Sequence, residues 1–147
     1  MPVLLKMTSC QSASDVIAIH GVDKAMFEKF HDYHVISGSK SDFQAGKSSA
    51  LIGERIAERY GWKTGASVTV TELGGISFDV AGIFTTNGTA DDFVILTGIQ
   101  FLQEVDDIQG IANRIFVKLK PGESPDAVCK VIEDLPLVTT VTVQGEE

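Results

Sequence analysis

The feature that most restricts the fold of this chain is a strand–helix–strand pattern in its last third. Residues 114–120 alternate apolar and charged side chains, as a strand with one buried face does. Pro121 and Gly122 end that pattern. Ser124 can cap a helix, and Pro125 suits its first turn, where the missing amide costs nothing. The apolar stripe of this helix is made of Val128, Val131, Ile132 and Leu135.

A strand–helix–strand unit cannot bury its sheet face alone, so other segments must complete the sheet. Residues 137–143 alternate again and form the closing strand. Residues 3–7 and 15–19 are β-prone runs joined by a polar stretch, which predicts a hairpin that supplies the missing strands. We therefore expect an α+β fold with a ferredoxin-like strand–helix–strand lobe built from both chain ends. Residues 36–109 would be an inserted, smaller β-rich α+β lobe with its own core, within one domain over 1–147.

The clearest helical pattern covers residues 49–60, because apolar side chains recur every four residues and charged side chains fill the other face. The recurring residues are Ile52, Ile56 and Tyr60. Ser48 or Ser49 can cap the first amides. Gly61 can take the left-handed conformation that ends a helix, which would fold Trp62 back onto the apolar face near Ile56.

The segment after this helix favours strands. Residues 67–71 and 76–84 alternate apolar and polar side chains on either side of Gly74-Gly75, which predicts an antiparallel hairpin. The other expected elements are a short helix capped by Asp23 with Met26, Phe27 and Phe30 on one face, a brief strand at Val35–Ile36, a turn at Asn87–Gly88, a buried strand at Phe93–Leu96 and a helix over Ile99–Val105.

Charge and hydropathy exclude two classes of protein. The chain has 12 Lys and Arg against 20 Asp and Glu, a formal net charge of −8, so a phosphate backbone is repelled and nucleic acid is excluded as a partner. The longest apolar run, residues 93–99, falls far short of the ~20 residues that a membrane-spanning helix needs. Residues 1–6 do not have the pattern of a signal peptide. These features fit a cytosolic protein or a soluble piece of a membrane protein.

A possible nucleotide site is the sequence Gly46-Lys47-Ser48, which looks like the end of a phosphate-binding loop. That motif requires a glycine five positions before Gly46, where this chain has Ser41, and a buried strand leading into the loop. Here a polar stretch precedes it. We interpret the segment as a loop that enters a capped helix, and we expect no nucleotide binding.

Two groups of residues could ligate metals, but neither has the spacing of a known site. His31-Asp32-Tyr33-His34 offers two imidazoles and a carboxylate, yet zinc usually needs a third or fourth ligand, and His20 is the only other histidine. Asp91-Asp92 and Asp106-Asp107 could bind a hard cation but lack the loop spacing of a calcium site. We interpret these as a solvated helix end and as acidic surface, and expect no metal and no cofactor.

The sequence contains no recognisable catalytic centre. No Gly-x-Ser-x-Gly motif is present, and Cys10 has no motif that names a histidine partner. Cys10 and Cys129 could form a disulfide in an oxidising compartment, but their pairing cannot be read from the sequence. We expect that the chain is not an enzyme and has no catalytic residues, and its partner-binding residues stay open.

Three blocks, taken in order, resemble the extracytoplasmic core domain of MacB/FtsX-like ABC-transporter permeases. The first is residues 16–23, a strand that ends in an apolar-x-Gly-Val-Asp turn. The second comprises residues 50–71, 78–84 and 91–102, similar to the helix, strands and glutamine-containing helix of that family. The third is residues 113–143. One departure is Ala66, which stands where the family commonly has Asp.

The resemblance implies a soluble extracytoplasmic, periplasmic part of an inner-membrane or cell-membrane permease that couples ATP-driven motion to export or to contact with a partner protein. Its partners would be the rest of the permease and its ATP-binding subunit, with a periplasmic adaptor protein as a further candidate. A dimer is expected only in the full-length transporter. The transported substrate, the adaptor and the state of the isolated domain stay open.

Two alternatives remain beside this reading. One is a stand-alone module that binds a small ligand or a peptide between its lobes. The other is an enzyme of unrecognised type, which would require a cleft with convergent polar groups of shifted acidity. Apolar helices on both sides of the segment in the full gene product would favour the permease, and an uninterrupted soluble chain would favour the module.

Overall fold

The computed structural model describes residues 17–44, 47–71, 74–110, 115 and 117–135, together with the backbone of residues 3–4. The chain divides into two compact units, Met1–Ile115 and Phe116–Glu147. The first unit contains a mixed sheet and the short helices that pack on it. The described part of the second contains one helix, α4 (Pro125–Glu133), with Ser124 at its N-cap position and Pro125 at its first position, as the sequence predicted. The Ser124 side chain makes no capping hydrogen bond, and the predicted apolar stripe is not buried, since Val131 and Leu135 are exposed.

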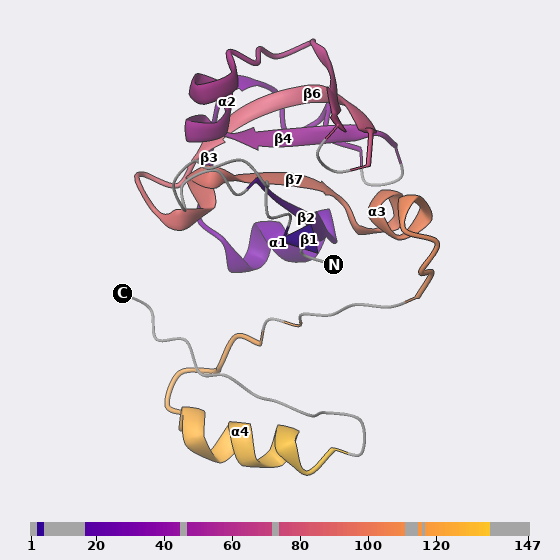
Figure 1. Ribbon diagram of the computed structural model, residues 1–147. Helices are drawn as coiled ribbons and strands as arrows, with labels where there is room; N and C mark the ends of the chain where they lie inside the picture. Colours follow the sequence, from indigo (N-terminus) through magenta and orange to yellow (C-terminus); the bar gives the residue numbers. More distant parts are fainter. Residues whose placement is uncertain are drawn as a thin grey trace, which may run out of the picture. The chain divides into compact units, whose positions relative to one another are not determined.

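The sheet of the first unit joins strands that are far apart in the sequence. In hydrogen-bonded order they are β1 (Val3–Leu4), β2 (Ala18–Val22), β7 (Val94–Gly98), β4 (Ser49–Gly53), β6 (Ile76–Thr85) and β3 (His34–Gly38), while β5 (Ser67–Val70) also pairs with β6. Figure 1 shows β6, β4, β7 and β2 following one another in this order. The pairs β2–β7 and β4–β6 are parallel, and the other pairs are antiparallel.

The helices of the first unit are short. They are α1 (Lys24–Phe30), α2 (Glu54–Tyr60), the 3-10 helix η2 (Ala90–Phe93) and α3 (Ile99–Val105). The predicted cap of α1 is confirmed, since the Asp23 carboxylate accepts a hydrogen bond from the Met26 amide at 3.0 Å. The predicted helix over Ile99–Val105 is confirmed as well, and its Leu102 is buried.

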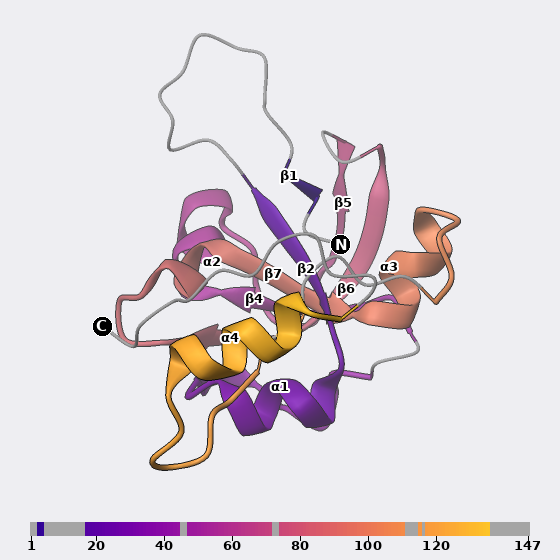
Figure 2. The ribbon, with the colours of Figure 1, turned by 90° about the horizontal axis from the view of Figure 1, so that it is seen from below.

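Two apolar cores cover the two faces of the sheet, because side chains alternate along each strand. Ala50 and Ile52 of β4 belong to one core, which also contains Ile56 of α2 and Leu102 of α3. Leu51, the residue between them, belongs to the other core. Its further members include Leu96, Phe84 and Tyr33, with Phe27 of α1 packed against it. In Figure 2, α2 lies on one side of β4 and β7, and α1 lies on the other.

A β-bulge moves the side chains of β6 from one core to the other. Ala50 pairs with Val80, whereas Leu51 pairs with Gly82, so Ala81 has no partner of its own on β4. Before the bulge, the even-numbered residues Ile76, Phe78 and Val80 lie in the core with α2, and after it Phe84 lies in the core with α1. The predicted hairpin is confirmed, but simple alternation could not reveal this change of face.

The N-terminal hairpin is confirmed in part. Val3 and Leu4 pair antiparallel with Ile19 and Ala18. β2 then pairs along its whole length with β7, so the hairpin shares one sheet with strands drawn from residues 34–98. The predicted separation of a chain-end lobe from a lobe over residues 36–109 therefore does not hold for this sheet, although the α+β class does.

The ferredoxin-like lobe is not confirmed. Of the strand expected over 114–120, the described residues 115 and 117–120 carry no strand, and the closing strand over 137–143 lies outside the described residues. The extent of the domain over 1–147 stays a prediction.

The predicted helix over residues 49–60 is wrong in its first part. Ser49–Gly53 forms β4, a fully buried central strand, and α2 begins only at Glu54 with Gly53 as its N-cap. The error arises because a short apolar run such as Ala50–Ile52 is compatible with a buried strand as well as with a helix. Pairing with β6 on one side and β7 on the other decides for a strand. The Ser49 hydroxyl caps no helix and instead bonds the backbone of Gln44.

The end of α2 agrees with the prediction. Gly61 has φ 68°, in the left-handed region, and the Trp62 amide donates to the Ala57 carbonyl oxygen at 3.0 Å. Trp62 packs against the core that contains Ile56, and its ring meets the Phe78 ring edge-on at a centroid distance of 6.2 Å. Three further expectations hold, the last of them with a shift at its first residue, whereas Met26 and Val105, predicted on the apolar faces of their helices, are exposed. β3 contains Val35–Ile36, Asn87 and Gly88 have positive φ in a turn, and Phe93 lies in η2, just before β7.

Candidate functional site

A hollow in the described part of the chain lies at the carboxyl ends of β2 and β7. The two strands run parallel and end together, with Val22 opposite Gly98. The hollow is open to solvent and has a volume of about 330 Å³. It is lined by Val22, Asp23, Lys24, Ala25, Glu28, Ile99 and Gln100.

The topology explains why a hollow forms at this point. After β2 the chain enters α1, whose Phe27 packs on one face of the sheet. After β7 the chain enters α3, whose Leu102 packs on the opposite face. Adjacent parallel strands whose helices leave to opposite faces create a crevice beyond the strand ends, which is the usual place for a binding site in a parallel sheet. Gly21 allows α3 to pack closely against β2, because a Cβ at this residue would lie 3.1 Å from the Ile99 Cα atom.

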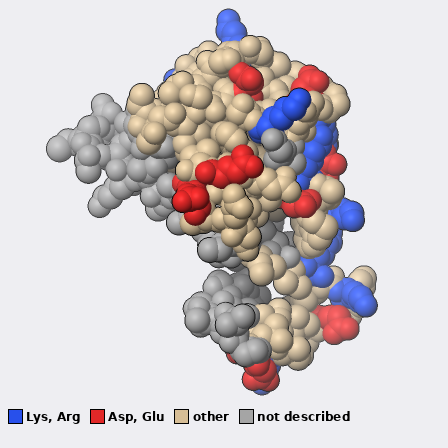
Figure 3. All heavy atoms as spheres, turned by 90° about the vertical axis from the view of Figure 1, so that its right-hand side faces the viewer, with Lys and Arg blue, Asp and Glu red and all other residues tan. Residues whose placement is uncertain are grey.

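Charged groups surround an apolar floor in this hollow. Val22, Ala25 and Ile99 provide apolar surface. The Lys24 ammonium is already engaged, since it donates to the carbonyl oxygens of Lys40 at 2.6 Å and of Phe43 at 3.0 Å. Figure 3, which looks at the side of the molecule where α3 lies, shows acidic and basic side chains scattered over a mostly uncharged surface.

Glu28 on the wall of the hollow also bonds a buried phenol. The Tyr33 hydroxyl donates to the Glu28 carboxylate at 3.3 Å. Burial, followed by the charge of Glu28 and the hydrogen bond to it, raises the pKa of Tyr33 to about 12. At neutral pH the phenol therefore keeps its proton and cannot act as a base.

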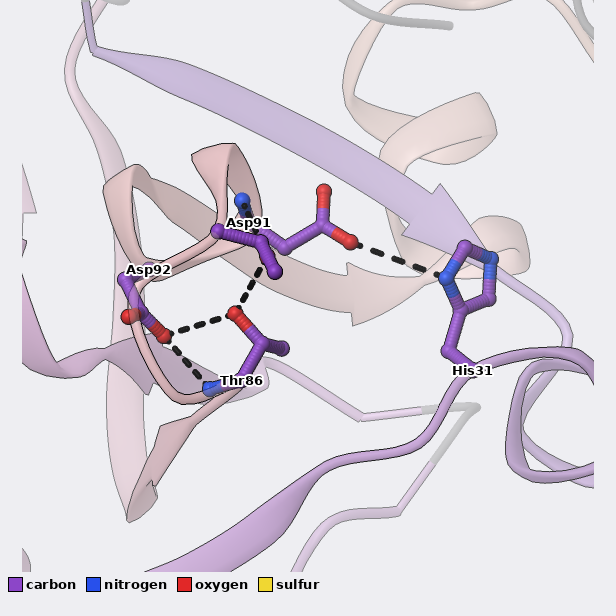
Figure 4. Close-up of polar contacts among 5 residues, drawn as sticks. His31, Thr86, Asp91 and Asp92 are labelled. Atoms are coloured by element: carbon purple, nitrogen blue, oxygen red, sulfur yellow. Dashed lines mark hydrogen bonds and ion pairs between the residues drawn. The ribbon is translucent and has the colours of Figure 1, made fainter. Parts of the chain in front are cut away.

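A second polar cluster surrounds Asp92, in the loop between β6 and β7 (Figure 4). Asp92 is 1% exposed. One carboxylate oxygen accepts from the Thr86 amide at 2.6 Å and the Thr86 hydroxyl at 2.8 Å, and the other accepts from the Gly88 amide at 2.8 Å. Burial acts to raise the pKa of Asp92, but the hydrogen bonds from Thr86 and Gly88 outweigh it and hold the pKa below its ordinary value.

This geometry corrects the interpretation of Asp91-Asp92 as acidic surface. Asp92 is a buried anchor whose two oxygens already accept hydrogen bonds from the protein, so they are not available to a hard cation. Asp91 points the other way, and its carboxylate lies 3.6 Å from the His31 imidazole nitrogen Nδ1 (Figure 4). His31 also stacks on Phe27, with ring centroids 4.3 Å apart.

The structure does not bring the other predicted ligands together. Tyr33 is buried, whereas His34 is exposed on β3, so the residues 31–34 do not converge. Asp106 and Asp107 follow α3, and Asp107 has a positive φ of 52°. Within the described ranges, no three His, Cys, Asp or Glu side chains gather closely enough to hold a metal ion.

The phosphate-loop candidate has the wrong architecture in the residues that can be described. Lys47 and Ser48 form a turn that leads into the strand β4, so the expectation that this loop enters a helix is wrong. Gly46 lies outside the described residues.

The cysteines lie in separate parts of the chain. Cys10 is outside the described residues, and Cys129 is a free thiol on α4. No helix within the described ranges is long and apolar enough to cross a membrane.

Sequence reasoning missed the hollow, although a signal was present. Two strands each pass directly into a helix, at Val22-Asp23 and at Gly98-Ile99, and such junctions mark possible crevice walls. What the sequence could not show is that β2 and β7 are neighbours. Their pairing spans more than seventy residues and depends on the sheet as a whole.

Comparison with known proteins gives a family match and a fold match. The profile of the MacB-like periplasmic core domain matches residues 3–135. A solved domain of a Porphyromonas gingivalis protein assigned as a permease has a similar fold, with a TM-score of 0.52 and 20% sequence identity. The match covers 78% of this chain and 51% of that one, so this chain spans about half the length of the solved domain. No curated protein matches the chain.

Proposed function

Because the chain belongs to the family of MacB-like periplasmic core domains, and is thus an extracytoplasmic domain of the ABC-transporter permease class, we propose that it transmits ATP-driven motion of a transporter to a partner protein or substrate outside the cytoplasm. The observation that carries this proposal is the family match, which extends over residues 3–135. Energy would come from ATP hydrolysis on a separate ATP-binding subunit, and the rest of the permease would connect that subunit to this domain.

The geometry of the described residues supports a mechanical role. The seven-stranded sheet is covered on both faces, and its central strand β4 is buried along its whole length. Dense packing of this kind transmits displacement because a close-packed interior deforms little. The loop between β6 and β7 is held by the buried Asp92, so it moves together with the sheet.

We propose further that the domain itself performs no catalysis. Tyr33 keeps its proton at neutral pH, as any tyrosine does, and its pKa is raised further, to about 12. Asp92 is committed to hydrogen bonds inside the protein. Neither group is among the residues that line the hollow. The lining is a mixture of apolar and charged side chains, which suits a contact surface. The alternative of a stand-alone binding module would use the same hollow, but the family match favours the permease.

The proposal is tested in the full-length permease, co-expressed with its ATP-binding subunit. Replacing residues 17–110 by a Gly/Ser linker should leave co-purification of the two subunits intact and abolish export or partner contact. The matched control is Ala90→Lys, a single change at an exposed position of η2, which should behave like the native protein. Undiminished export by the deletion variant would refute the proposed role.

Location is tested separately. In a background where Cys10 and Cys129 are replaced by serine, Lys29→Cys places one thiol at an exposed position on α1. A membrane-impermeant maleimide should label this thiol in intact cells once any outer barrier is made permeable. A cysteine placed in the ATP-binding subunit should stay unlabelled until the cells are lysed. Labelling of Lys29→Cys only after lysis would contradict an extracytoplasmic location.

A further inference from the structure

We infer that the hollow at the carboxyl ends of β2 and β7 is a docking site for a partner protein segment that inserts an apolar side chain flanked by Lys or Arg. This inference rests on the proposed function, because it takes contact with a partner as the task of the domain. It adds the place of that contact and the chemistry of the segment that fits it.

The size and shape of the hollow favour a side chain over a free small molecule. Pockets that hold small molecules enclose most of the ligand surface and range from about 300 to 1,000 Å³. This hollow, at about 330 Å³, is at the bottom of that range and open to solvent, so it cannot enclose such a ligand. It can accept one or two apolar side chains that remain attached to a larger partner, with Val22, Ala25 and Ile99 as the contact surface.

The charges of the rim favour a basic partner. Asp23 and Glu28 each present a carboxylate at the hollow, and both residues are exposed. The Asp23 oxygen Oδ1 caps α1 and the Glu28 oxygen Oε1 accepts from Tyr33, while each carboxylate has a second oxygen. The only cation in the lining, Lys24, directs its ammonium to the carbonyl oxygens of Lys40 and Phe43. The lining therefore carries two carboxylates against one ammonium, which keeps its charge but is held at these carbonyl oxygens, so the net charge of the lining is negative.

The walls of the hollow are fixed before a partner arrives. The Asp23 cap sets the first turn of α1, and the bonds from Lys24 tie that turn to the loop at residues 40–43. On the other side, the close approach of α3 to Gly21 sets the position of Ile99. A preformed site loses little conformational entropy when it binds, which favours specific docking even on a small surface.

The experiment is an NMR titration of the 147-residue chain with three short synthetic peptides. The probe is acetyl-Lys-Leu-Phe-Lys-amide. One control peptide replaces Leu-Phe by Ala-Ala, and the other replaces both lysines by Glu. We expect saturable amide shifts at Val22, Ala25, Ile99 and Gln100 with the probe, in the millimolar range typical of a single-pocket contact, and at least about tenfold weaker binding of each control peptide.

Matched variants test the location. Ala25→Lys adds bulk and positive charge at an exposed position in the hollow, and should weaken binding of the probe at least about tenfold. Ala90→Lys makes the same change at an exposed position of η2, beside the opposite end of β7, and should leave binding unchanged. Both positions are exposed, so neither variant is expected to unfold the chain, which the dispersion of its amide spectrum verifies.

Three results would overturn the inference: shifts confined to residues outside the hollow, equal binding by the two lysine variants, or binding of the Glu peptide as tight as that of the probe. None of these results bears on the deletion and labelling experiments in the full-length permease. Failure of the docking site is therefore distinguishable from failure of the proposed function.

Discussion

Replacing Asp92 by Asn should destabilise the first unit more than any other isosteric change of a carboxylate in its described part. The buried carboxylate accepts three hydrogen bonds, at 2.6, 2.8 and 2.8 Å. The Asn side chain has only one acceptor oxygen, so its NH2 group must face the backbone N–H donor of either Thr86 or Gly88. At least one bond to a charged acceptor is lost, a buried donor is left unpaired, and the remaining bonds lose their charge. Together these effects cost about 3 kcal/mol.

Urea unfolding followed by circular dichroism measures this change as a shift in the midpoint at constant slope. The matched control is Asp91→Asn, one residue away. The Asp91 side chain is 38% exposed and pairs only with His31 at the surface among the contacts described, so its loss should cost less than about 1 kcal/mol. The two variants have the same change in charge, and only the buried one should lower stability strongly.

The pH dependence gives a second, independent readout. The folded-state pKa of Asp92 lies below its ordinary value, so the stabilisation is complete above the pKa of the unfolded chain, about 3.9, and is lost as pH falls through the folded-state pKa. The difference between the native protein and Asp92→Asn should therefore be constant from pH 7 to pH 5 and shrink below about pH 4. A native-like midpoint for Asp92→Asn, or a difference that is equal at pH 7 and pH 3, would refute the reasoning.

Three further predictions concern two glycines and nucleotide binding. Gly61→Val should lower the free energy of unfolding in urea by about 1–2 kcal/mol, and Gly61→Asn by much less. The φ angle is 68° but no atom lies within 4 Å of an added Cβ, so the cost is backbone strain and not collision. Equal stability of both variants would contradict this. Gly53→Ala should lower the free energy of unfolding by about 2–3 kcal/mol for the opposite reason. Its φ is an ordinary −60°, but the new Cβ would lie 2.3 Å from the Asp92 carbonyl oxygen. A thermal melt like that of the native chain would disprove the close approach. Calorimetry should detect no ATP binding by the chain, whose net charge is −8, and saturable micromolar binding would contradict this expectation.

The sequence by itself determined the local features of this protein. Asp23 caps α1, Gly61 ends α2, and the hairpin of β5 and β6 forms where alternation and Gly74-Gly75 predict it. Each of these features depends on neighbours within a few residues, so the chain alone carries the information. The family resemblance was also visible in the order of such local blocks, and the match over residues 3–135 confirms it.

Tertiary structure decided what depends on distant partners. Residues 49–53 became a strand because β6 and β7 hold them from both sides, against a helical spacing in the sequence. Asp92 is buried because η2 packs against α2 and β4, although the bonds to its carboxylate come from residues only four and six positions away. The hollow exists only because β2 and β7, more than seventy residues apart, run parallel as neighbours. Pairings of this kind are fixed by the packing of the whole sheet, and no local pattern of residues encodes them.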